Sequence, residues 1–526
     1  MPNKIIVTNG TELTRKYGKA GLKAIRAELK KLAAADKTVR SLATAIIFLD
    51  VAADMKPYGG NTVTSAGDCR QNKVAIDAVF AKETPDYLVI LGAPDVVPYQ
   101  DMLNPVHDPG GDDDPLALGD LPYACDKPYS RDVNKFIGPT RVVGRLPDLC
   151  SAGSGNGNLA YITGVIRAAA ASKPKPQPDP LDYFGLSAAV WTVSTQLSLQ
   201  GVYGDDTRLL NCPKAGPTYT SKQLGKLSHF INCHGAQVSP TFYGQDPNNL
   251  DSYPDAMRST GLAGLTPGTA AAFECCYGAE LYDPQAAQGV MSIANRYLEK
   301  KACGVCASTT IAYGPPDSNA QADLMCRYFM LKVLSGASTG MAMLEARQEF
   351  IRTVGTLSPV DLKTLGQYVL LGDPSLQAFR AAKDPQEAIV TTKKVTMLKR
   401  DDAGDAARLA RRQKLATLGA AIGAVTSFAS EKAGPAAPSI RRFLAQQLNI
   451  PEARANVEAF HVHHPKSSIL TKTTSKLMDT RADKHYVLIH SKRRVEKEDG
   501  IGFDDLVGLV ASEIDGRMII RKFVRR

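Results

Sequence analysis

Residues 227–237 read LSHFINCHGAQ, and residues 269–281 read TAAAFECCYGAEL. Both stretches begin as apolar runs of strand length and end abruptly at a reactive side chain close to a glycine. The first run ends at His234, and the second ends at Cys275 and Cys276. In open α/β sheets the strands are nearly continuous in apolar character, and the site lies beyond their carboxyl ends. The two stretches therefore predict a fold class and the place of a site.

Strand and helix signals alternate around these two stretches. In chain order, the candidate strands are KIIVT, ATAIIFLDV, DYLVILGAP, TRVVGRLP, LSAAVWTVST, LSHFINC, GTAAAFECC and KACGVCAST. Helical patterns lie between several of them, at residues 19–34, 71–82, 318–335 and 338–354. Alternation of this kind predicts βαβ crossovers and an α/β fold with a mostly parallel sheet.

Length and charge divide the chain. At 526 residues it exceeds one ordinary core. Residues 1–380 carry 36 Lys and Arg against 36 Asp and Glu, whereas the remainder carries 27 against 17, so the net charge of +10 lies in the last part. We predict an N-terminal α/β subdomain at 1–172, a Pro- and Lys-rich linker, a catalytic subdomain at 181–380, and a small basic C-terminal α+β domain at 381–526.

The composition favours a cytoplasmic protein. No apolar run is long enough for a membrane span, and the first residues lack the apolar region and cleavage site of a secretory signal. The ten cysteines all precede residue 327, and several lie in apolar strands, which suits free thiols in a reducing compartment. We therefore expect no contact with membranes.

The ends of the two opening strands predict a thiol site. If consecutive strands are neighbours, His234 lies beside Cys275 or Cys276, and an imidazole beside a thiolate makes a nucleophile with its proton carrier. Gly235 allows a close backbone approach and offers an N–H group to an oxyanion, and Gly278 permits a sharp turn after the nucleophile. The alternative is a pair of buried strands that happen to end in His and Cys.

These residues carry a family resemblance. FINCHGA and FECCYGAELYDP resemble the His-Gly and Cys blocks of caspase-like (clan CD) cysteine peptidases. Further blocks are similar to the gingipain branch, and together they cover roughly residues 85–377: YLVILGAPDVVPY, DLPYACDKPY, VVGRLPD, GVCASTTIAYGPPDS and YVLLGDPSL. The resemblance implies a caspase-like three-layer α/β/α fold and an endopeptidase that acts through a Cys-His dyad and a thioester intermediate.

The resemblance leaves two candidates for the nucleophile. Cys276 matches the Cys-x-Gly order of caspases and the acidic-small-Cys order of legumain and metacaspases, with Glu274 as the acidic residue. Cys275 matches the Cys-x-x-Gly spacing. We prefer Cys276 as the nucleophile and keep Cys275 as the alternative, with His234 as the partner of either.

The resemblance also implies residues that bind substrate. The strand end at Ser308, Thr309 and Thr310, together with Tyr313, would line the pocket for the residue before the cut. Asp205 and Asp206 would form a salt bridge with a basic substrate side chain, or else form a solvated loop pair. Only the salt bridge with a basic substrate side chain would imply cleavage after Arg or Lys, including self-processing.

Three other patterns are weaker candidates for metal sites. HDPGGDDDP clusters Asp108 with Asp112, Asp113 and Asp114, which suits calcium, but its spacing is not that of an EF-hand and a solvated loop is preferred. Cys303 and Cys306 have zinc-knuckle spacing without a second pair and suit core packing better. HVHH at 461–464 is too isolated for a metal site. No cofactor is therefore required, and calcium is the one candidate.

The basic C-terminal region allows several partners. Clusters such as KRRVEK and RKFVRR would contact a polyanion, form a solvated or partner-binding face, or offer sites for self-cleavage. No aromatic residues are interleaved for base stacking, so we do not expect nucleic acid. The competing function is an inactive caspase-like scaffold that binds a protein or polyanionic partner. The expected partners of the enzyme are a protein or peptide substrate and a regulator.

Overall fold

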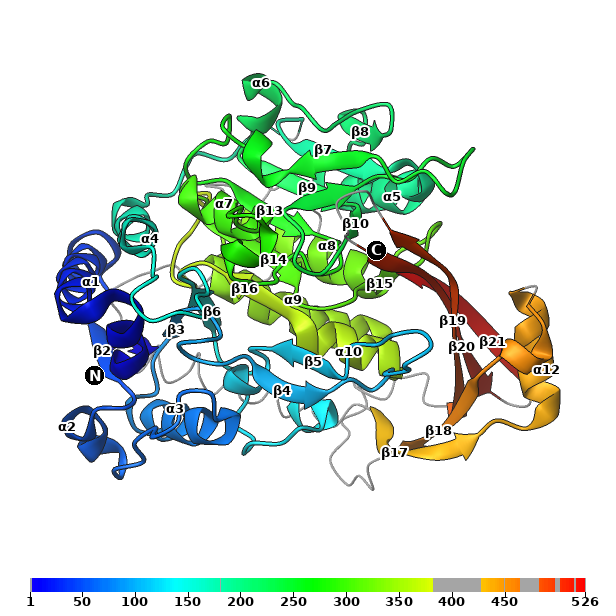
Figure 1. Cartoon of the computed structure of the whole chain (residues 1–526), viewed down its shortest axis with the longest axis horizontal. Helices are drawn as coiled ribbons and strands as arrows, with labels where there is room; N and C mark the ends of the chain where they lie inside the picture. Colours follow the sequence, from blue (N-terminus) through cyan, green and yellow to red (C-terminus); the bar gives the residue numbers. More distant parts are fainter. Residues whose placement is uncertain are drawn as a thin grey trace.

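A computed structural model of the chain describes residues 2–179, 181–381, 427–448, 450–463, 482–496, 502–514 and 517–525. A ten-stranded sheet runs through the middle of the molecule, and a six-stranded antiparallel sheet lies at one side of it (Figure 1). The predicted α/β class with a small C-terminal α+β unit is confirmed.

The central sheet consists of two parallel halves, which meet at the antiparallel pair of β14 and β16. In spatial order its strands are β2 (Thr44–Phe48), β1 (Lys4–Thr8), β3 (Tyr87–Leu91), β6 (Val143–Leu146), β16 (Tyr368–Leu371), β14 (Gly304–Ser308), β13 (Ala270–Phe273), β9 (Ser228–Asn232), β7 (Phe184–Ala188) and β8 (Leu209–Cys212). Neighbours are parallel except β14 and β16, which are antiparallel. The carboxyl ends of the second half, β14, β13, β9, β7 and β8, therefore meet at one edge.

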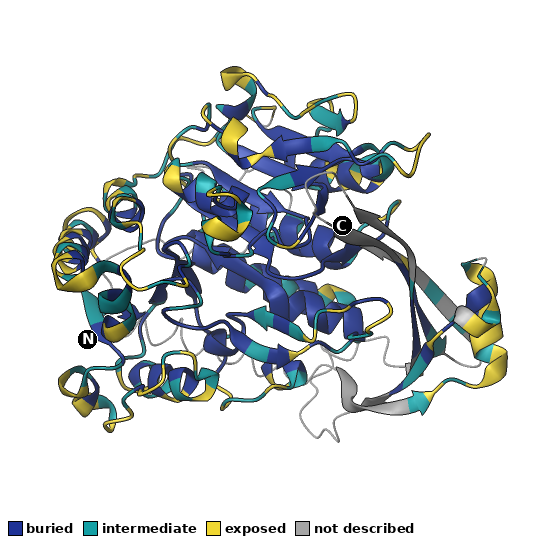
Figure 2. Ribbon diagram, in the orientation of Figure 1, coloured by how far each residue is buried: buried dark blue, intermediate teal, exposed yellow. Residues whose placement is uncertain are grey.

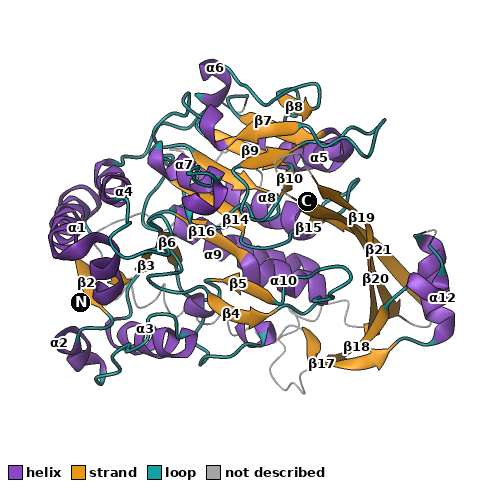
Figure 3. Cartoon of the chain, viewed as in Figure 1, coloured by secondary structure: helices purple, strands orange, loops and turns teal. Residues whose placement is uncertain are grey.

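Helices cover both faces of this sheet (Figure 3). One group contains α1 (Gly10–Arg40), α4 (Leu159–Ala171) and α7 (Ile293–Glu299), and the other contains α5 (Thr192–Tyr203), α8 (Gln321–Leu334) and α9 (Thr339–Val354). At β14, Cys303 lies beside residues of α4 and α7, whereas the Cys306 sulfur lies 3.7 Å from the Met343 sulfur of α9. The predicted three layers are confirmed, and the two cysteines face opposite sides of the sheet, as core residues do.

Shorter elements complete the larger unit. They are α2 (Ala52–Met55), α3 (Cys69–Glu83), α6 (Ser221–Leu224), α10 (Pro359–Gln367), the hairpin of β4 (Gln100–Leu103) and β5 (Leu116–Gly119), the small sheet of β10 (His234–Gly235), β11 (Thr241–Tyr243) and β12 (Asp255–Arg258), and the 3-10 turns η1 (Lys56–Tyr58), η2 (Pro122–Ala124), η3 (Val133–Phe136), η4 (Ala189–Trp191), η5 (Ser259–Gly261) and η6 (Pro284–Ala287). Side chains cap the helices where the sequence supplies Asn, Asp, Ser or Thr, as Asn9 does for α1.

One expected strand is partly wrong. LSAAVWTVST was predicted to be extended throughout, but β7 ends at Ala188 and α5 begins at Thr192. The hydroxyl of Thr192 donates to the Ala189 carbonyl at 2.7 Å, and that of Thr195 donates to the Trp191 carbonyl at 2.9 Å. These local bonds offset the preference of Thr and Val for strands.

The C-terminal sheet includes a strand from the larger unit. Its order is β15 (Tyr313–Gly314), β21 (Arg517–Arg525), β20 (Gly502–Ile514), β19 (Ala482–Glu496), β18 (Val457–His463) and β17 (Ser427–Pro435), accompanied by α12 (Pro438–Gln447) and η7 (Glu452–Arg454). The stretch DAARLARRQKLATLGAAIGAVTSFA at 405–429 has a helical pattern and predicts a helix. Residues 405–426 lie outside the described part, and residues 427–429 begin β17. The side chains of HVHH at 461–464 also lie outside it.

The two faces of this sheet have different partners. Tyr486 and Leu488 pack with Leu444 of α12 in a small core of their own. Val487 and Ile489, which alternate with them along β19, belong to the core of the larger unit. Figure 2 shows this packing as buried residues along the inner strands and exposed residues on α12. The domain boundary near residue 380 stays a prediction, and the parts on either side of it share a sheet and a core.

No helix in the described ranges combines the length and the apolar character needed to cross a membrane.

A buried ion cluster fastens the first strand to the last strand of the larger unit. The Lys4 ammonium lies 2.9 Å from an Asp36 carboxylate oxygen, contacts Asp373 and donates to the Ser375 hydroxyl at 3.1 Å. Lys4, Asp36 and Asp373 have no exposed surface. Removing a buried cation leaves charged partners without compensation, which costs far more than losing a surface pair.

We predict that Lys4→Ala lowers the free energy of unfolding by about 3–5 kcal/mol, measured by denaturant titration. The matched control is Lys31→Ala, which removes an exposed 3.0 Å pair with Glu28. It should cost less than about 1 kcal/mol. Equal losses of unfolding free energy in the two variants would contradict the conclusion that Lys4 belongs to a stabilising buried ion cluster.

Candidate functional site

The two opening stretches form adjacent parallel strands. β9 pairs with β13 so that Ile231 lies opposite Phe273. The pattern continues past the strands, because the Glu274 N–H group donates to the Ile231 carbonyl at 2.8 Å. Continuing the same register brings His234 level with Cys276. The prediction that these strands are neighbours is confirmed.

Two loops leave this edge and touch each other. We call residues 234–240 the His loop and residues 274–281 the Cys loop. A Cβ atom added at Gly235 would lie 1.8 Å from the Cys276 carbonyl oxygen and 3.3 Å from the Cys276 nitrogen. Atoms cannot approach so closely, so glycine is required at 235 because the backbone of the His loop lies directly against the Cys loop.

The turn of the Cys loop depends on Tyr277 rather than on Gly278. Tyr277 has the left-handed φ of +55°, whereas Gly278 is not among the residues with positive φ. A Cβ at Gly278 would lie 3.2 Å from the Cys275 carbonyl oxygen, and the Gly278 N–H group donates to that carbonyl. The expectation that Gly278 supplies conformational freedom is therefore wrong: this glycine serves close packing.

His234 is held between two aromatic rings and an amide. Its ring centroid lies 4.2 Å from that of Trp191 and 5.1 Å from that of Tyr253. His234 Nε2 lies 3.0 Å from Gln245 Oε1, and Gln245 Nε2 donates to the Tyr253 hydroxyl and the Leu250 carbonyl. Since the amide nitrogen is used for donation, Oε1 accepts from His234 Nε2–H. In the neutral ring, Nδ1 is then the basic nitrogen.

The two neighbouring cysteines have different surroundings. The Ala312 N–H group donates to the Cys276 sulfur at 3.2 Å, on the side of the loop that follows β14. The Cys275 sulfur instead lies 3.9 Å from the Ile231 carbonyl and close to Cys233 and Tyr297. Adjacent residues of an extended chain point to opposite faces. Cys276 is therefore the cysteine beside the loop edge, and Cys275 belongs to the core.

The expected pocket residues hold the loop after β14 in place. The Ser308 hydroxyl donates to the Thr310 carbonyl at 2.8 Å, and the Thr309 hydroxyl donates to the Leu118 carbonyl at 2.5 Å. The Thr310 hydroxyl bonds to Gln367. All three residues are buried and lie next to the Cys loop, where the Ala279 N–H group donates to the Ser308 carbonyl at 2.7 Å. Their backbone thus lies beside the Cys loop and their hydroxyls bond internally, and their role in lining a substrate pocket stays a prediction.

Asp205 and Asp206 lie elsewhere. They follow α5 and precede β8, which is parallel to β7. This position is at the amino end of β8, opposite to the edge where His234 and Cys276 lie. Asp205 accepts from the Tyr183 hydroxyl at 3.0 Å, and Asp206 accepts from Gln200 at 2.7 Å. The topology does not bring this pair to the candidate site.

The acidic loop at 107–115 supports the site through an ion cluster. Asp112 contacts the Lys363 ammonium and accepts from the Tyr313 hydroxyl at 2.7 Å. Asp114 accepts from the Tyr277 hydroxyl at 2.9 Å and from the Ile311 N–H group at 2.8 Å, and lies 3.4 Å from Lys363. These two carboxylates therefore fasten both loops that surround Cys276.

An ammonium group occupies the place between these carboxylates that calcium would need. Burial raises the pKa of Asp112, and Lys363 opposes this shift. Asp113 is exposed, and Asp108 accepts from its own loop at the Gly110 N–H group. Across the described ranges, no group of three or more His, Cys, Asp or Glu side chains converges as metal ligands.

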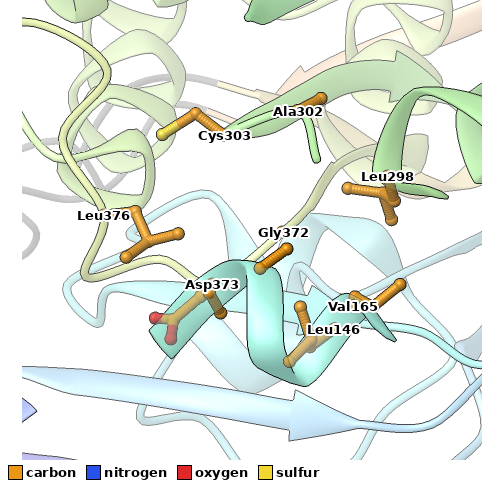
Figure 4. A pocket seen from close by; sticks show the side chains of 10 residues that line it. Leu146, Val165, Leu298, Ala302, Cys303, Gly372, Asp373 and Leu376 are labelled. Atoms are coloured by element: carbon orange, nitrogen blue, oxygen red, sulfur yellow. The ribbon is translucent and has the colours of Figure 1, made fainter. Parts of the chain in front are cut away.

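A small cavity elsewhere is not part of this site. Figure 4 shows Leu146, Val165, Leu298, Cys303 and Asp373 around it. It lies at the end of β16 and the start of β14, at the edge of the sheet opposite to His234 and Cys276. It is mainly apolar and is interpreted as a packing gap.

Comparison with known proteins gives structural likeness without sequence likeness. No protein-family model and no curated protein sequence matches the chain. The solved structure of a protease matches with a TM-score of 0.44 and 13% identity, over 99% of this chain and 97% of that chain. The separase–securin complex of Saccharomyces cerevisiae gives 0.29 and 10%, over 55% of this chain and 16% of that chain. Dimeric latent PorU from Porphyromonas gingivalis gives 0.30 and 10%, over 100% and 43%.

These likenesses are distant. The chain spans less than half the length of the separase and PorU chains that it matches. Any activity of this chain must therefore be inferred from its own side chains.

Sequence analysis missed several residues of the site. Trp191 is the single tryptophan of the chain and follows a strand that ends at the same edge, so its rarity could have drawn attention to it. Gln245 and Tyr253 lie in a polar stretch without a motif, and Lys363 lies in a helix far away in sequence. Only the packing of the loops identifies these three.

We predict that Gly235→Ala lowers the free energy of unfolding by about 1–3 kcal/mol, because an added methyl group must separate the His loop from the Cys loop. The control is Gly164→Ala in α4, where an added Cβ has no heavy atom within 4 Å. That change should raise the stability by about 0.5–1 kcal/mol. If denaturant titration shows that Gly235→Ala is as stable as the wild type, the His loop and the Cys loop do not touch.

A second prediction concerns Glu280, whose carboxylate accepts from the Val238 N–H group at 2.6 Å and so joins the two loops. Burial raises its pKa from 4.5 to about 8, and Asp114 adds to this effect. The Glu280 carboxyl group therefore binds its proton more tightly in the native state than in the unfolded state. The resulting stabilisation is complete below about pH 4.5 and is lost as the pH rises toward 8.

Glu280→Gln keeps the acceptor and cannot ionise, so its free energy of unfolding should fall less than that of the wild type between about pH 5 and pH 8. Denaturant titrations across this range measure the difference. Glu299→Gln changes an exposed residue and should keep the wild-type dependence. The same pH dependence in Glu280→Gln and the wild type would contradict the assignment.

Proposed function

We propose that this protein is a caspase-like cysteine endopeptidase in which Cys276 is the nucleophile and His234 is its proton carrier. The observation that carries the proposal is the register of β9 and β13, which brings His234 and Cys276 level at one sheet edge. The contact of Gly235 with the Cys276 carbonyl adds to it. A thiol and an imidazole at one edge form the parts of a nucleophilic dyad.

The surroundings of Cys276 favour it over Cys275. A backbone N–H group directed at sulfur stabilises a thiolate relative to a thiol, and Ala312 provides one at 3.2 Å. A backbone carbonyl lies near each sulfur, Ala312 at 3.5 Å from Cys276 and Ile231 at 3.9 Å from Cys275, so the N–H group at Cys276 is the difference on which the preference rests. Cys276 is itself fully buried in this structure, so its reaction with a substrate requires that the covering parts move.

The proposed reaction is peptide hydrolysis in two steps. Nδ1 of His234 accepts the thiol proton, and the Cys276 sulfur attacks the scissile carbonyl carbon. The C–N bond breaks and the amine leaves with the proton from His234, which yields a thioester. Water then attacks the thioester and gives a proton to His234, and the carboxylic acid and the thiol are released. The N–H groups of Gly235 and Cys276 are the proposed oxyanion donors.

Gln245 is a positioning residue in this proposal. By accepting from Nε2–H, it directs the basic Nδ1 to the reaction and keeps the ring between Trp191 and Tyr253. Because Asp205 and Asp206 lie at the opposite edge, they do not support cleavage after a basic residue. The substrate class is therefore a peptide or protein, without an assigned side chain before the cut.

The second candidate function is an inactive scaffold that binds a protein partner through the same edge. The internal hydrogen bonds of Ser308, Thr309 and Thr310 and the burial of Cys276 favour it. Incubation with peptidyl acyloxymethyl ketones of varied side chain, with and without calcium, followed by intact mass, separates the two functions. Covalent labelling supports the enzyme, and failure of every probe supports the scaffold.

We predict that Cys276→Ala abolishes labelling and peptide turnover, and that His234→Ala falls to the same residual rate, because members of a dyad act as a unit. Cys275→Ala should keep turnover and lose about 1 kcal/mol of stability from a small buried side chain. Peptide-library cleavage with mass readout measures the rates, and denaturant titration measures stability. Turnover in Cys276→Ala together with none in Cys275→Ala would make Cys275 the nucleophile.

A further inference from the structure

The backbone edge of β15 has a partner from the far end of the chain. Tyr313 pairs with Arg525, and Gly314 pairs with Val524, in antiparallel register. We propose that β15 is a peptide-binding edge beside Cys276 and that β21 (Arg517–Arg525), the latch strand, fills it and closes the site. The regulatory meaning of this closure rests on the proposed peptidase function.

The register directs the latch strand toward the candidate nucleophile. Since Val524 lies opposite Gly314 and Arg525 lies opposite Tyr313, the latch strand runs toward Ala312. The N–H group of Ala312 is the one that donates to the Cys276 sulfur. The paired backbone therefore ends one residue away from the group that contacts sulfur, and Cys276 has no exposed surface.

The β15 edge is suited to an added strand. A strand edge presents unpaired N–H and C=O groups, and an extended peptide can pair with them through its main chain. Within the described residues, the latch strand is the neighbour of β15 in its sheet. An incoming peptide that pairs with β15 on the side where the latch strand lies must displace the latch strand, because both use the same backbone groups.

The acidic loop connects the C-terminal sheet to this edge. A Cβ added at Gly111 would lie 3.0 Å from a methyl group of Ile489 on β19. The next residue, Asp112, accepts from the Tyr313 hydroxyl and contacts Lys363. The C-terminal sheet, the acidic loop and β15 thus form one continuous set of contacts, so release of the sheet also removes a support of Tyr313.

A pocket lies at the seam between the acidic loop and the C-terminal sheet. It is lined by polar residues of both sides, His107, Asp108, Asn456 and Glu458, and by apolar residues that include Phe460, Val487 and Ile489. The polar part of this lining costs less to expose to water than an apolar contact of equal area. This seam is where we expect the sheet to separate from the larger unit when the latch strand leaves β15.

Arg525 offers a test that acts on this pairing alone. The pairing of β20 with the latch strand covers Arg517 to Val524, whereas Arg525 pairs with Tyr313. Arg525→Pro removes one main-chain donor and restricts the backbone at that position. Arg525→Ala keeps the main chain and is the matched control.

The measurement is alkylation of Cys276 by iodoacetamide in the full chain, read by peptide mapping, because it requires exposure of the thiol and no peptidase activity. We expect Arg525→Pro to raise its rate about tenfold, the effect of losing about one hydrogen bond of the pairing. Arg525→Ala should keep the wild-type rate. Cys69, which is partly exposed, serves as the internal reference.

Hydrogen exchange over residues 311–316 reports whether the proline has released the pairing. Faster exchange with unchanged alkylation of Cys276 would overturn the proposal, and so would unchanged exchange, because the pairing would then be absent in solution. Equal acceleration by the proline and alanine variants would also overturn it. A synthetic peptide with the sequence of residues 517–525 should slow the alkylation of Arg525→Pro again. Faster alkylation without peptide turnover would support the latch and reject the peptidase function.

Discussion

The arrangement of the site depends on the direct contact between the backbone at Gly235 and the carbonyl of Cys276. This contact is possible because two parallel neighbours, β9 and β13, end at the same level, and because residue 235 has no side chain. It leaves little freedom for either loop. The His234 ring is then fixed by Trp191 and Gln245, and the Cys276 sulfur by the N–H group of Ala312.

The two edges of the sheet carry different kinds of group. β14 and β16 are antiparallel, so the start of β14 lies beside the end of β16. The edge of the second half carries His234, Cys276 and Ser308, with reactive and polar groups in contact. The opposite edge carries the buried cluster of Lys4 and Asp373, whose charges are fully paired. The first edge brings the candidate catalytic side chains together. The second edge joins the two halves of the sheet through a buried ion cluster.

The acidic loop and the C-terminal sheet extend this organisation beyond the larger unit. Lys363 contacts both Asp112 and Asp114, so one buried cation compensates two carboxylates where the loop lies against buried strand ends. The same loop touches β19 at Gly111. The basic C-terminal region is therefore joined to the site by ordinary packing and by main-chain pairing at β15, which gives a physical route from that region to the thiol.

The sequence by itself determined the alternation of strands and helices, the neighbouring strands that end in His234 and Cys276, and the buried character of Cys303 and Cys306, because apolar runs and turn residues act locally. It could not distinguish the surroundings of Cys275 and Cys276, since adjacent residues differ only in the face to which they point. It left open whether Asp205 and Asp206 bind substrate or form a solvated loop pair, because charge alone does not show at which edge of a sheet a loop lies. The partners Gln245, Lys363 and the strand at Arg525 were decided by tertiary structure alone. They come from distant parts of the chain, and contacts across such separations depend on packing and register that no local pattern records.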